Sequence, residues 1–175
     1  SDYSLVTRLL IQRAHFWIDY IQRLLNRIGS DYGQYRELFH DMSGVQAINA
    51  SLSSIYSSIT GLSTNLSDSH DNGPTVAIIE FCGSYKVVYK PKALGVEVAF
   101  NNFIEWINRR GVSCDLRTAR CVDCGEYGWT EYIDKAGCST RQQIEKYYYR
   151  SGMVLAIVYA LRGGDYIHDN IIASS

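Results

Sequence analysis

The pattern of hydrophobic and polar positions divides the chain into helical and β-rich segments. Near the N-terminus, apolar residues recur every three or four positions, which is the spacing of one face of an α-helix. The residues of this stripe are Leu10, Ala14, Trp17, Ile21, Leu24 and Ile28. The stripe predicts a helix over residues 3–28, which Gly29-Ser30-Asp31 ends.

Two further helices are expected before residue 63, a short one over residues 34–42 and a longer one after it. The longer one follows from a second stripe with helical spacing: Val45, Ile48, Leu52, Ile55, Ile59 and Leu62. Several serines lie between these positions and would occupy the outer face. A serine-rich linker is the alternative, but a linker would not keep the apolar stripe. We assign these helices a packing role and no chemistry.

The middle of the chain reads as two β-hairpins separated by a helix. After a polar loop, residues 75–81 and 84–90 are rich in β-branched and aromatic side chains and predict an antiparallel pair. Residues 116–122 and 129–133 predict a second hairpin. The helix between them has two faces, one with Val96, Phe100, Phe103 and Ile107, the other with Glu97, Asn101, Glu105 and Asn108, and it ends at Gly111.

A long helix is predicted near the C-terminus, over residues 140–162, with Ser139 as its N-cap. Residues 152–161 are apolar on all sides, as in a helix buried within a lobe. This run is too short to span a bilayer. We therefore expect no membrane span.

Charge and cysteine content narrow the function classes. The formal net charge of −1 offers no electrostatic attraction for nucleic acid or an anionic membrane. Five irregularly spaced cysteines and no signal peptide favour reduced thiols and a cytoplasmic location. A zinc site of Cys114, Cys121, Cys124 and Cys138 is conceivable, but no second C-x-x-C is present. We favour chance cysteines around a hairpin.

The residues after the last helix carry the first chemical signal. Asp165 and Asn170 have the D-x-x-x-x-N spacing of a phosphotransferase catalytic loop. There the aspartate orients the attacking hydroxyl, and the asparagine binds a magnesium ion on the nucleotide phosphates. By itself the pattern also fits an ordinary turn.

The order of the elements favours the phosphotransferase. Lys90 ends a strand, a helix with glutamates follows, and the catalytic-type loop comes after the last helix. This is the order of parts in a protein kinase, where the lysine holds phosphates and a helix glutamate holds the lysine. Glu97 is the first candidate for that glutamate, and Glu105 is the second.

Four groups of short motifs then point to one family. They are Asp68-Ser69-His70-Asp71-Asn72-Gly73; Val88-Tyr89-Lys90-Pro91-Lys92 with Val98-Ala99-Phe100-Asn101; Tyr127-Gly128-Trp129-Thr130-Glu131; and Gly164-Asp165 through Asn170-Ile171-Ile172-Ala173. From about Asp68 to its end, the chain resembles the dehydratase domain of class II lanthipeptide synthetases of the LanM type. The helices before Asp68 fit only in general character.

The resemblance implies an α+β fold with a core like that of a protein or lipid kinase. Residues 1–66 would be a helical region, and residues 67–137 an N-lobe-like antiparallel sheet with a helix. Residues 138–175 would begin a helical C-lobe with the catalytic loop. The kinase-like core would thus be truncated.

The implied activity is dehydration of a ribosomally made precursor peptide, bound by its leader. Such enzymes phosphorylate serine and threonine of the Ser-, Thr- and Cys-rich core with ATP and Mg²⁺. They then eliminate the phosphate to leave dehydroamino acids, and a C-terminal cyclase domain adds cysteine thiols.

Carried over by motif, Lys90 matches the phosphate-binding lysine, Asp165 the catalytic aspartate and Asn170 the magnesium ligand. Asp68 and His70 match the pair assigned to phosphate elimination.

The catalytic loop departs from the family at one position. The family's loop has a histidine two residues after the aspartate, whereas Ile167 stands there and His168 follows one place later. A second magnesium aspartate, the arginine and threonine of elimination, and the cyclase would lie beyond Ser175. We therefore expect a fragment of a longer enzyme, inactive in isolation.

Two alternatives remain open. A non-catalytic kinase-like module that only binds peptide is motivated by Ile167 and the missing aspartate. A small-molecule phosphotransferase shares the roles of Asp165 and Asn170 but gives no reason for Asp68 and His70.

Overall fold

The computed structural model describes residues 4–39, 51–64, 66, 74–164 and 172. The fold is α+β, as expected, and has two compact units. The first comprises Ser1–Val98 and Arg120–Tyr132, and the second comprises Ala99–Ala119 and Ile133–Ser175. We describe each unit by itself. The domain boundaries implied by the family resemblance remain a prediction.

The first unit begins with helices. The predicted N-terminal helix is confirmed as α1, Ser4–Ser30. The short helix expected next is an α-helical turn, α2, Tyr32–Tyr35, followed by a 3₁₀ turn, η1, Arg36–Leu38. A further short helix, α3, spans Leu52–Ser57.

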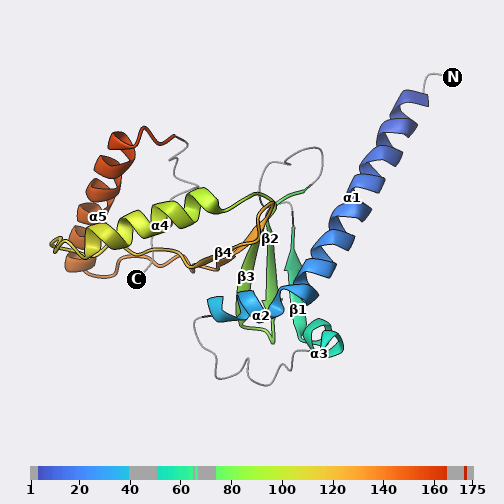
Figure 1. Ribbon diagram of the computed structural model, residues 1–175, viewed down its shortest axis with the longest axis horizontal. Helices are drawn as coiled ribbons and strands as arrows, with labels where there is room; N and C mark the ends of the chain where they lie inside the picture. Colours follow the sequence, from blue (N-terminus) through green and yellow to red (C-terminus); the bar gives the residue numbers. More distant parts are fainter. Residues whose placement is uncertain (1–3, 40–50, 65, 67–73, 165–171, 173–175) are drawn as a thin grey trace. The chain divides into compact units, whose positions relative to one another are not determined.

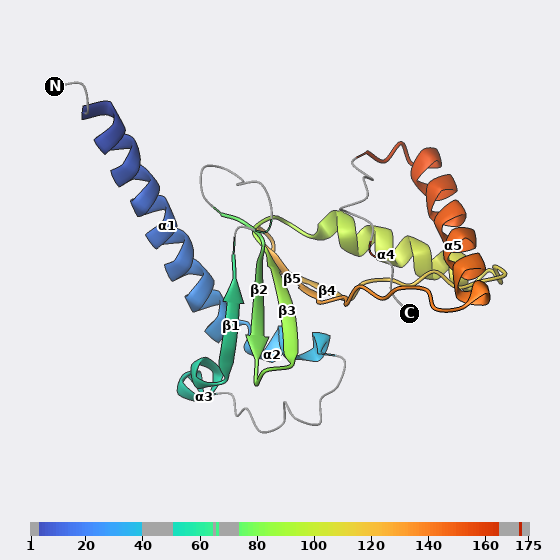
Figure 2. The same ribbon diagram turned by 180° about the vertical axis from the view of Figure 1, so that it is seen from behind.

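A five-stranded antiparallel sheet forms the rest of the first unit (Figures 1 and 2). Its strands are β1 Ile59–Ser63, β2 Ala77–Phe81, β3 Tyr85–Lys90, β4 Cys121–Asp123 and β5 Gly128–Glu131. The spatial order is β1-β2-β3-β5-β4. Both predicted hairpins, β2-β3 and β4-β5, are therefore confirmed, and β5 joins them by pairing with β3.

Strand β1 contradicts the sequence pattern. A helix was expected to run to Leu62, but α3 ends at Ser57 and residues from Ile59 pair with β2. The physical reason is that Ile59 and Leu62 satisfy helical spacing, whereas the hydrogen bonds that β2 offers decide the conformation. Tertiary pairing commonly overrides such local preferences.

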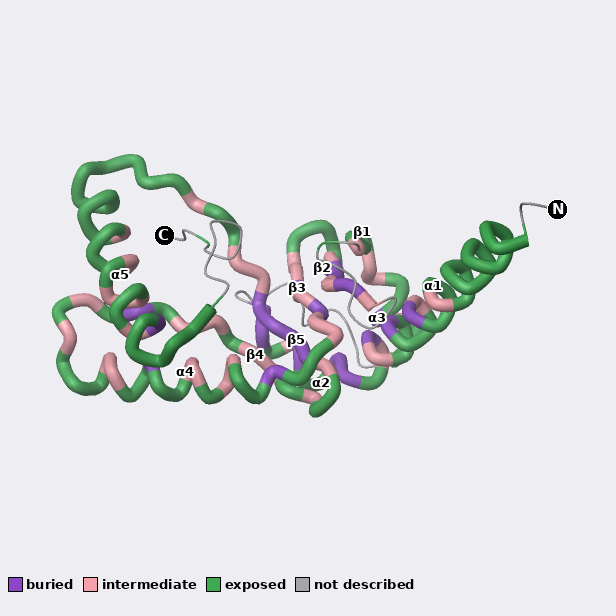
Figure 3. The backbone as a smooth tube through the Cα atoms, turned by 90° about the horizontal axis from the view of Figure 1, so that it is seen from above, coloured by how far each residue is buried: buried purple, intermediate pink, exposed green. Residues whose placement is uncertain are grey.

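The core of the first unit lies between the sheet and its N-terminal helices. Alternate residues of β2 and β3 face it, and they meet the C-terminal half of α1 and the aromatic side chains of α2. Tyr35 packs on Trp129 with ring centroids 4.5 Å apart. The predicted stripe on α1 is buried only at Leu24 and Ile28, whereas Leu10 and Trp17 are 65% and 58% exposed. Figure 3 shows the N-terminal part of α1 as exposed.

The second unit contains most of α4, Gly95–Asn108, and all of α5, Arg141–Ala160. The side chain of Asn108 bonds to both the N–H and the carbonyl of Leu116, which fastens the chain beside α4. Ile104 is the buried residue of α4, whereas Val96, on the apolar face that the sequence predicted to be buried, is 80% exposed. The buried face of α4 therefore differs from the predicted one.

Two expectations for the last helix are wrong. Its N-cap is Thr140, not Ser139, because Thr140 forms a capping box with Gln143. Its C-terminal part is also not buried on all sides: Val158 is buried, whereas Leu155 and Tyr159 are 68% and 85% exposed. Among the described residues, no helix is long and apolar enough to cross a membrane.

Candidate functional site

Lys90 lies at the end of β3 on the sheet face opposite the core. Side chains alternate along a strand, so the buried Val87 and Tyr89 place Lys86, Val88 and Lys90 on the other face. Lys90 pairs with Gly128 of β5, and Gly128 pairs with Asp123 of β4. These three residues therefore form one row across three adjacent strands, on the same face as Lys90.

Gly128 leaves room in this row for Leu94. A Cβ at position 128 would overlap the side chain of Leu94 and the carbonyl oxygen of Val122. Leu94 itself is fully buried. The missing side chain thus lets Leu94 lie directly on β5, over the residue that pairs with Lys90.

Asp123 holds Leu94 in that place. Its Oδ1 accepts hydrogen bonds from Leu94 N at 3.0 Å and from Gly125 N at 3.1 Å. Gly125 has φ +88, a left-handed conformation that glycine adopts without steric penalty. One carboxylate therefore stabilises both the β4-β5 turn and the residue before α4.

Partial burial lowers the pKa of Lys90, because burial disfavours the charged ammonium. The nearby Glu97 opposes this shift, Lys92 adds to it, and Cys121 opposes it. No ion pair joins Lys90 to a carboxylate in the described part of the chain. Lys90 is thus a half-buried amine, and a bound anion would stabilise its charged form.

Glu97 pairs with a different lysine from the one expected. Its Oε1 lies 2.8 Å from Lys92 Nζ. Burial alone would raise the pKa of Glu97, but the hydrogen bond from Lys92, its own backbone N–H and the charges of Lys92 and Lys90 lower it. The expected contact between Glu97 and Lys90 is therefore electrostatic, and the direct ion pair is with Lys92.

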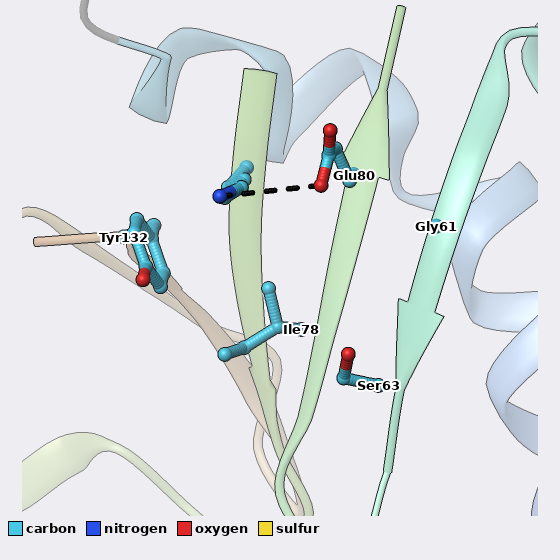
Figure 4. A pocket seen from close by; sticks show the side chains of 6 residues that line it. Gly61, Ser63, Ile78, Glu80 and Tyr132 are labelled. Carbon is cyan, nitrogen blue, oxygen red and sulfur yellow. Dashed lines mark ion pairs between the residues drawn. The ribbon is translucent and has the colours of Figure 1, made fainter. Parts of the chain in front are cut away.

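A small pocket lies on the same sheet face, toward the other end of β3 (Figure 4). It has a volume of about 180 Å³ and is lined by Gly61, Ser63, Ile78, Glu80, Lys86 and Tyr132. Lys86 Nζ is 4.0 Å from Glu80 Oε2 and 5.1 Å from the centre of the Tyr132 ring. The pocket combines one apolar wall with both signs of charge.

The segment Tyr127–Glu131 joins the site to the core. On the core side, Tyr127 Oη and Trp129 Nε1 donate to Oδ2 of the buried Asp31, at 2.8 and 2.9 Å. Burial raises the pKa of Tyr127, and the hydrogen bond to Asp31 adds to the shift. Arg27 stacks 3.6 Å over the Tyr127 ring.

The end of the same segment is bound to η1. Arg120 donates through Nε to Glu131 at 3.1 Å, and through its other nitrogens to the carbonyls of Glu37 and Leu38. The resemblance had singled out this motif without assigning it a role. Its contacts explain it as the link between the N-terminal helices and the strand beside Lys90.

The other predicted site residues lie outside the described part of the chain. These are Asp68, His70, Asp165, His168 and Asn170. The four cysteines considered for a zinc site, which we interpret as chance cysteines, are described, and among the described residues no metal-binding group is found. Cys121 faces the side of Lys90, whereas Cys124 packs against the core.

Sequence reasoning missed Asp123, Leu94 and Lys92. Asp123 carried a usable signal, since an aspartate two residues before a glycine often forms a turn in which its side chain binds the backbone. Leu94 carried none, because its contact with Gly128 joins residues 34 positions apart.

Comparisons with known proteins agree with the family resemblance. Residues 3–175 match the family described as "Domain of unknown function (DUF4135)". The protein described as "Lacticin 481/lactococcin biosynthesis protein LcnDR2", from Lactococcus lactis subsp. lactis, is 31% identical over 106 residues. The match covers 55% of this chain and 12% of that protein. The resemblance to class II lanthipeptide synthetases is thereby confirmed.

Proposed function

We propose, on the premise that the chain belongs to the DUF4135 family, that it is part of a lanthipeptide dehydratase. In this proposal the enzyme transfers phosphate from ATP to serine and threonine of a precursor peptide. It then eliminates that phosphate to give dehydroamino acids. The name of the relative from Lactococcus lactis supports a role in making such peptides.

The observation that carries the proposal is the environment of Lys90. A half-buried ammonium at a strand end, with its pKa lowered by burial, gains stability from a bound anion. The helix α4 begins five residues later and brings Glu97 near it. A strand-end lysine followed by a helix glutamate is the order found around the phosphate-binding lysine of kinases, and it supports the proposal. Here the direct ion pair of Glu97 is with Lys92.

The remaining roles follow the resemblance and are part of the same proposal. Asp165 orients the attacking hydroxyl, and Asn170 contributes an oxygen ligand to Mg²⁺. Asp68 and His70 serve elimination, in which a base removes the α-proton while the bond from carbon to the phosphate oxygen breaks. The departure at Ile167 leaves His168 as the nearest imidazole for a role in the loop.

The wider setting is also proposed by resemblance. The sheet unit would be the N-lobe of a kinase-like core, and α5 would begin the C-lobe. A cyclase domain would follow in the longer protein, and the protein would act in the cytoplasm. The chain itself matches 12% of the length of the Lactococcus relative.

The test compares two lysines on one face of one strand. In the full-length protein, Lys90→Ala should reduce phosphate transfer to the precursor by about a hundredfold or more, because a positioned cationic group is lost. Lys86→Ala, the matched control, should stay within roughly threefold of wild type at saturating peptide, because Lys86 is loosely paired and any role of its pocket in peptide binding would appear only below saturation. The measurement is mass spectrometry of a Ser-, Thr- and Cys-rich candidate precursor peptide. Normal transfer by Lys90→Ala would refute the assignment.

A second candidate is a peptide-binding module without catalysis, favoured by the pocket between Glu80, Lys86 and Tyr132. Its volume of about 180 Å³ suits one amino-acid side chain better than a whole small-molecule ligand. If wild-type protein binds the precursor but adds no phosphate in the presence of ATP and Mg²⁺, this candidate replaces the enzyme.

A further inference from the structure

The connection between β3 and α4 is only four residues long, from Pro91 to Leu94, and it carries the residues around Lys90. Lys92 lies within it, and Glu97 lies in the first turn of α4. Any movement of Leu94 would therefore move the Lys92–Glu97 ion pair relative to Lys90. The contacts that hold this connection on the sheet therefore determine which groups lie around Lys90.

Two groups on neighbouring strands hold it. Asp123 Oδ1 accepts the N–H of Leu94 at 3.0 Å, and Gly128 provides the space in which the Leu94 side chain lies. The second carboxylate oxygen, Oδ2, would lie 3.6 Å from a Cβ built on Gly95, so it faces the first residue of α4. A negative charge there is favourable, because the N-terminus of a helix carries partial positive charge.

Asp123 reaches Lys90 only through Leu94. Adjacent strands are about 4.8 Å apart, so the Cα atoms of Lys90 and Asp123 are separated by roughly 10 Å across β5. Leu94 lies in this gap, over Gly128. The carboxylate is bound to backbone N–H groups and does not neutralise Lys90, so its effect on the lysine is one of position.

We propose that Asp123 is the positioning residue of the Lys90 site: by binding the N–H of Leu94 it sets the distance and the polarity of the groups around the lysine. The inference rests on the proposed function for what Lys90 binds. The geometry of Asp123, Leu94 and Gly128 stands without it.

The test uses the full-length protein and two variants of Asp123. In Asp123→Ala the N–H of Leu94 loses its hydrogen-bond acceptor, and Leu94 should move away from Gly128. Lys90 then becomes more exposed to water, so its pKa should rise toward its ordinary value of 10.5. Asp123→Asn keeps an oxygen for the N–H groups of Leu94 and Gly125, and it should behave as wild type. The pKa is measured from the pH dependence of Lys90 acetylation by mass spectrometry, with Lys86 as the internal reference.

The kinetic experiment measures KM for ATP and kcat separately for each variant. Asp123→Ala should raise KM by about tenfold, the size expected when a group that orients a ligand-binding residue is removed. Asp123→Asn should stay within roughly twofold, which is the rescue expected of a hydrogen-bond acceptor.

Three results decide the matter. An unchanged Lys90 pKa in Asp123→Ala, even with a lower melting temperature, overturns the inference, because it means Asp123 only stabilises the fold. Equal damage by Asn and Ala also overturns it, since the charge and not the hydrogen bond would matter. If wild type transfers no phosphate, the proposed function fails, whereas the acetylation comparison still decides the role of Asp123.

Discussion

Lys90 combines a charged group with partial burial, and this combination opposes folding. Desolvation is the largest influence on its pKa and lowers it, and the attraction of Glu97 only partly compensates. Residues kept for binding commonly reduce stability in this way, and replacing them can stabilise the fold. Replacing Lys90 should therefore increase stability and remove the proposed activity.

Lys90→Met should raise the melting temperature while abolishing phosphate transfer. Between the lowered pKa of folded Lys90 and 10.5, the unfolded chain binds more protons, so the stability of wild type increases with pH through this window. The gain from methionine should therefore be largest below the window and disappear above pH 10.5. Thermal unfolding at several pH values checks this, with Lys86→Met as the control. A gain independent of pH would indicate better packing and not the removal of a penalised charge.

At the scale of elements, β5 carries two sets of contacts on its two faces. Trp129 and Glu131 face the core and bind Asp31 and Arg120. Gly128 and Thr130 face the side of Lys90, where they pair with Lys90 and Val88 of β3. One short strand thus aligns the N-terminal helices with the candidate site, because strand alternation separates the two roles.

Gly128→Ala tests this strand directly. A methyl group there would overlap Leu94 and the Val122 carbonyl, and overpacking of this kind costs about 1–3 kcal/mol. Hydrogen exchange of the amides in β4 and β5 should accelerate accordingly. Gly152→Ala in α5 is the control: its Cβ meets nothing within 4 Å, and alanine should stabilise that helix by about 0.5–1 kcal/mol. Unchanged exchange in Gly128→Ala would mean that Leu94 can move away at little cost.

At the scale of the whole molecule, a polar link inside the first unit ties distant parts of the chain. Asp31 joins residues 96 and 98 positions away, at Tyr127 and Trp129. Arg120 ties β5 to the carbonyls of Glu37 and Leu38 over similar separations. Loop closure over such lengths opposes folding, and these hydrogen bonds hold the distant segments together once the core has formed.

Asp31→Ala should therefore loosen both the N-terminal helices and β5. It removes the acceptor of Tyr127 and Trp129, at roughly 1–3 kcal/mol for each buried group left unsatisfied. Asp31→Asn retains an acceptor oxygen and should lose much less. Urea unfolding monitored by Trp129 fluorescence, with the other tryptophans replaced by phenylalanine, compares the two. Equal losses in both variants would show that the charge of Asp31, and not its hydrogen bonds, stabilises the unit.

The sequence by itself determined most of the elements of this protein. Periodicity located α1, both hairpins, α4 and α5, because these segments bury one face and their apolar residues repeat accordingly. The order of the elements also placed Lys90 at a strand end just before a helix that carries Glu97. The motif from Tyr127 to Glu131 was visible as an unusual combination of residues, although its contacts were not.

Only the tertiary structure decided the rest. The strand β1 exists because β2 offers it hydrogen bonds, and the pairing of Glu97 with Lys92 depends on how the β3-α4 connection turns. The places of Leu94, Gly128 and Asp123 depend on three strands that meet side by side. Contacts between residues far apart in the chain leave no periodic trace in the sequence, because each depends on the packing of the others.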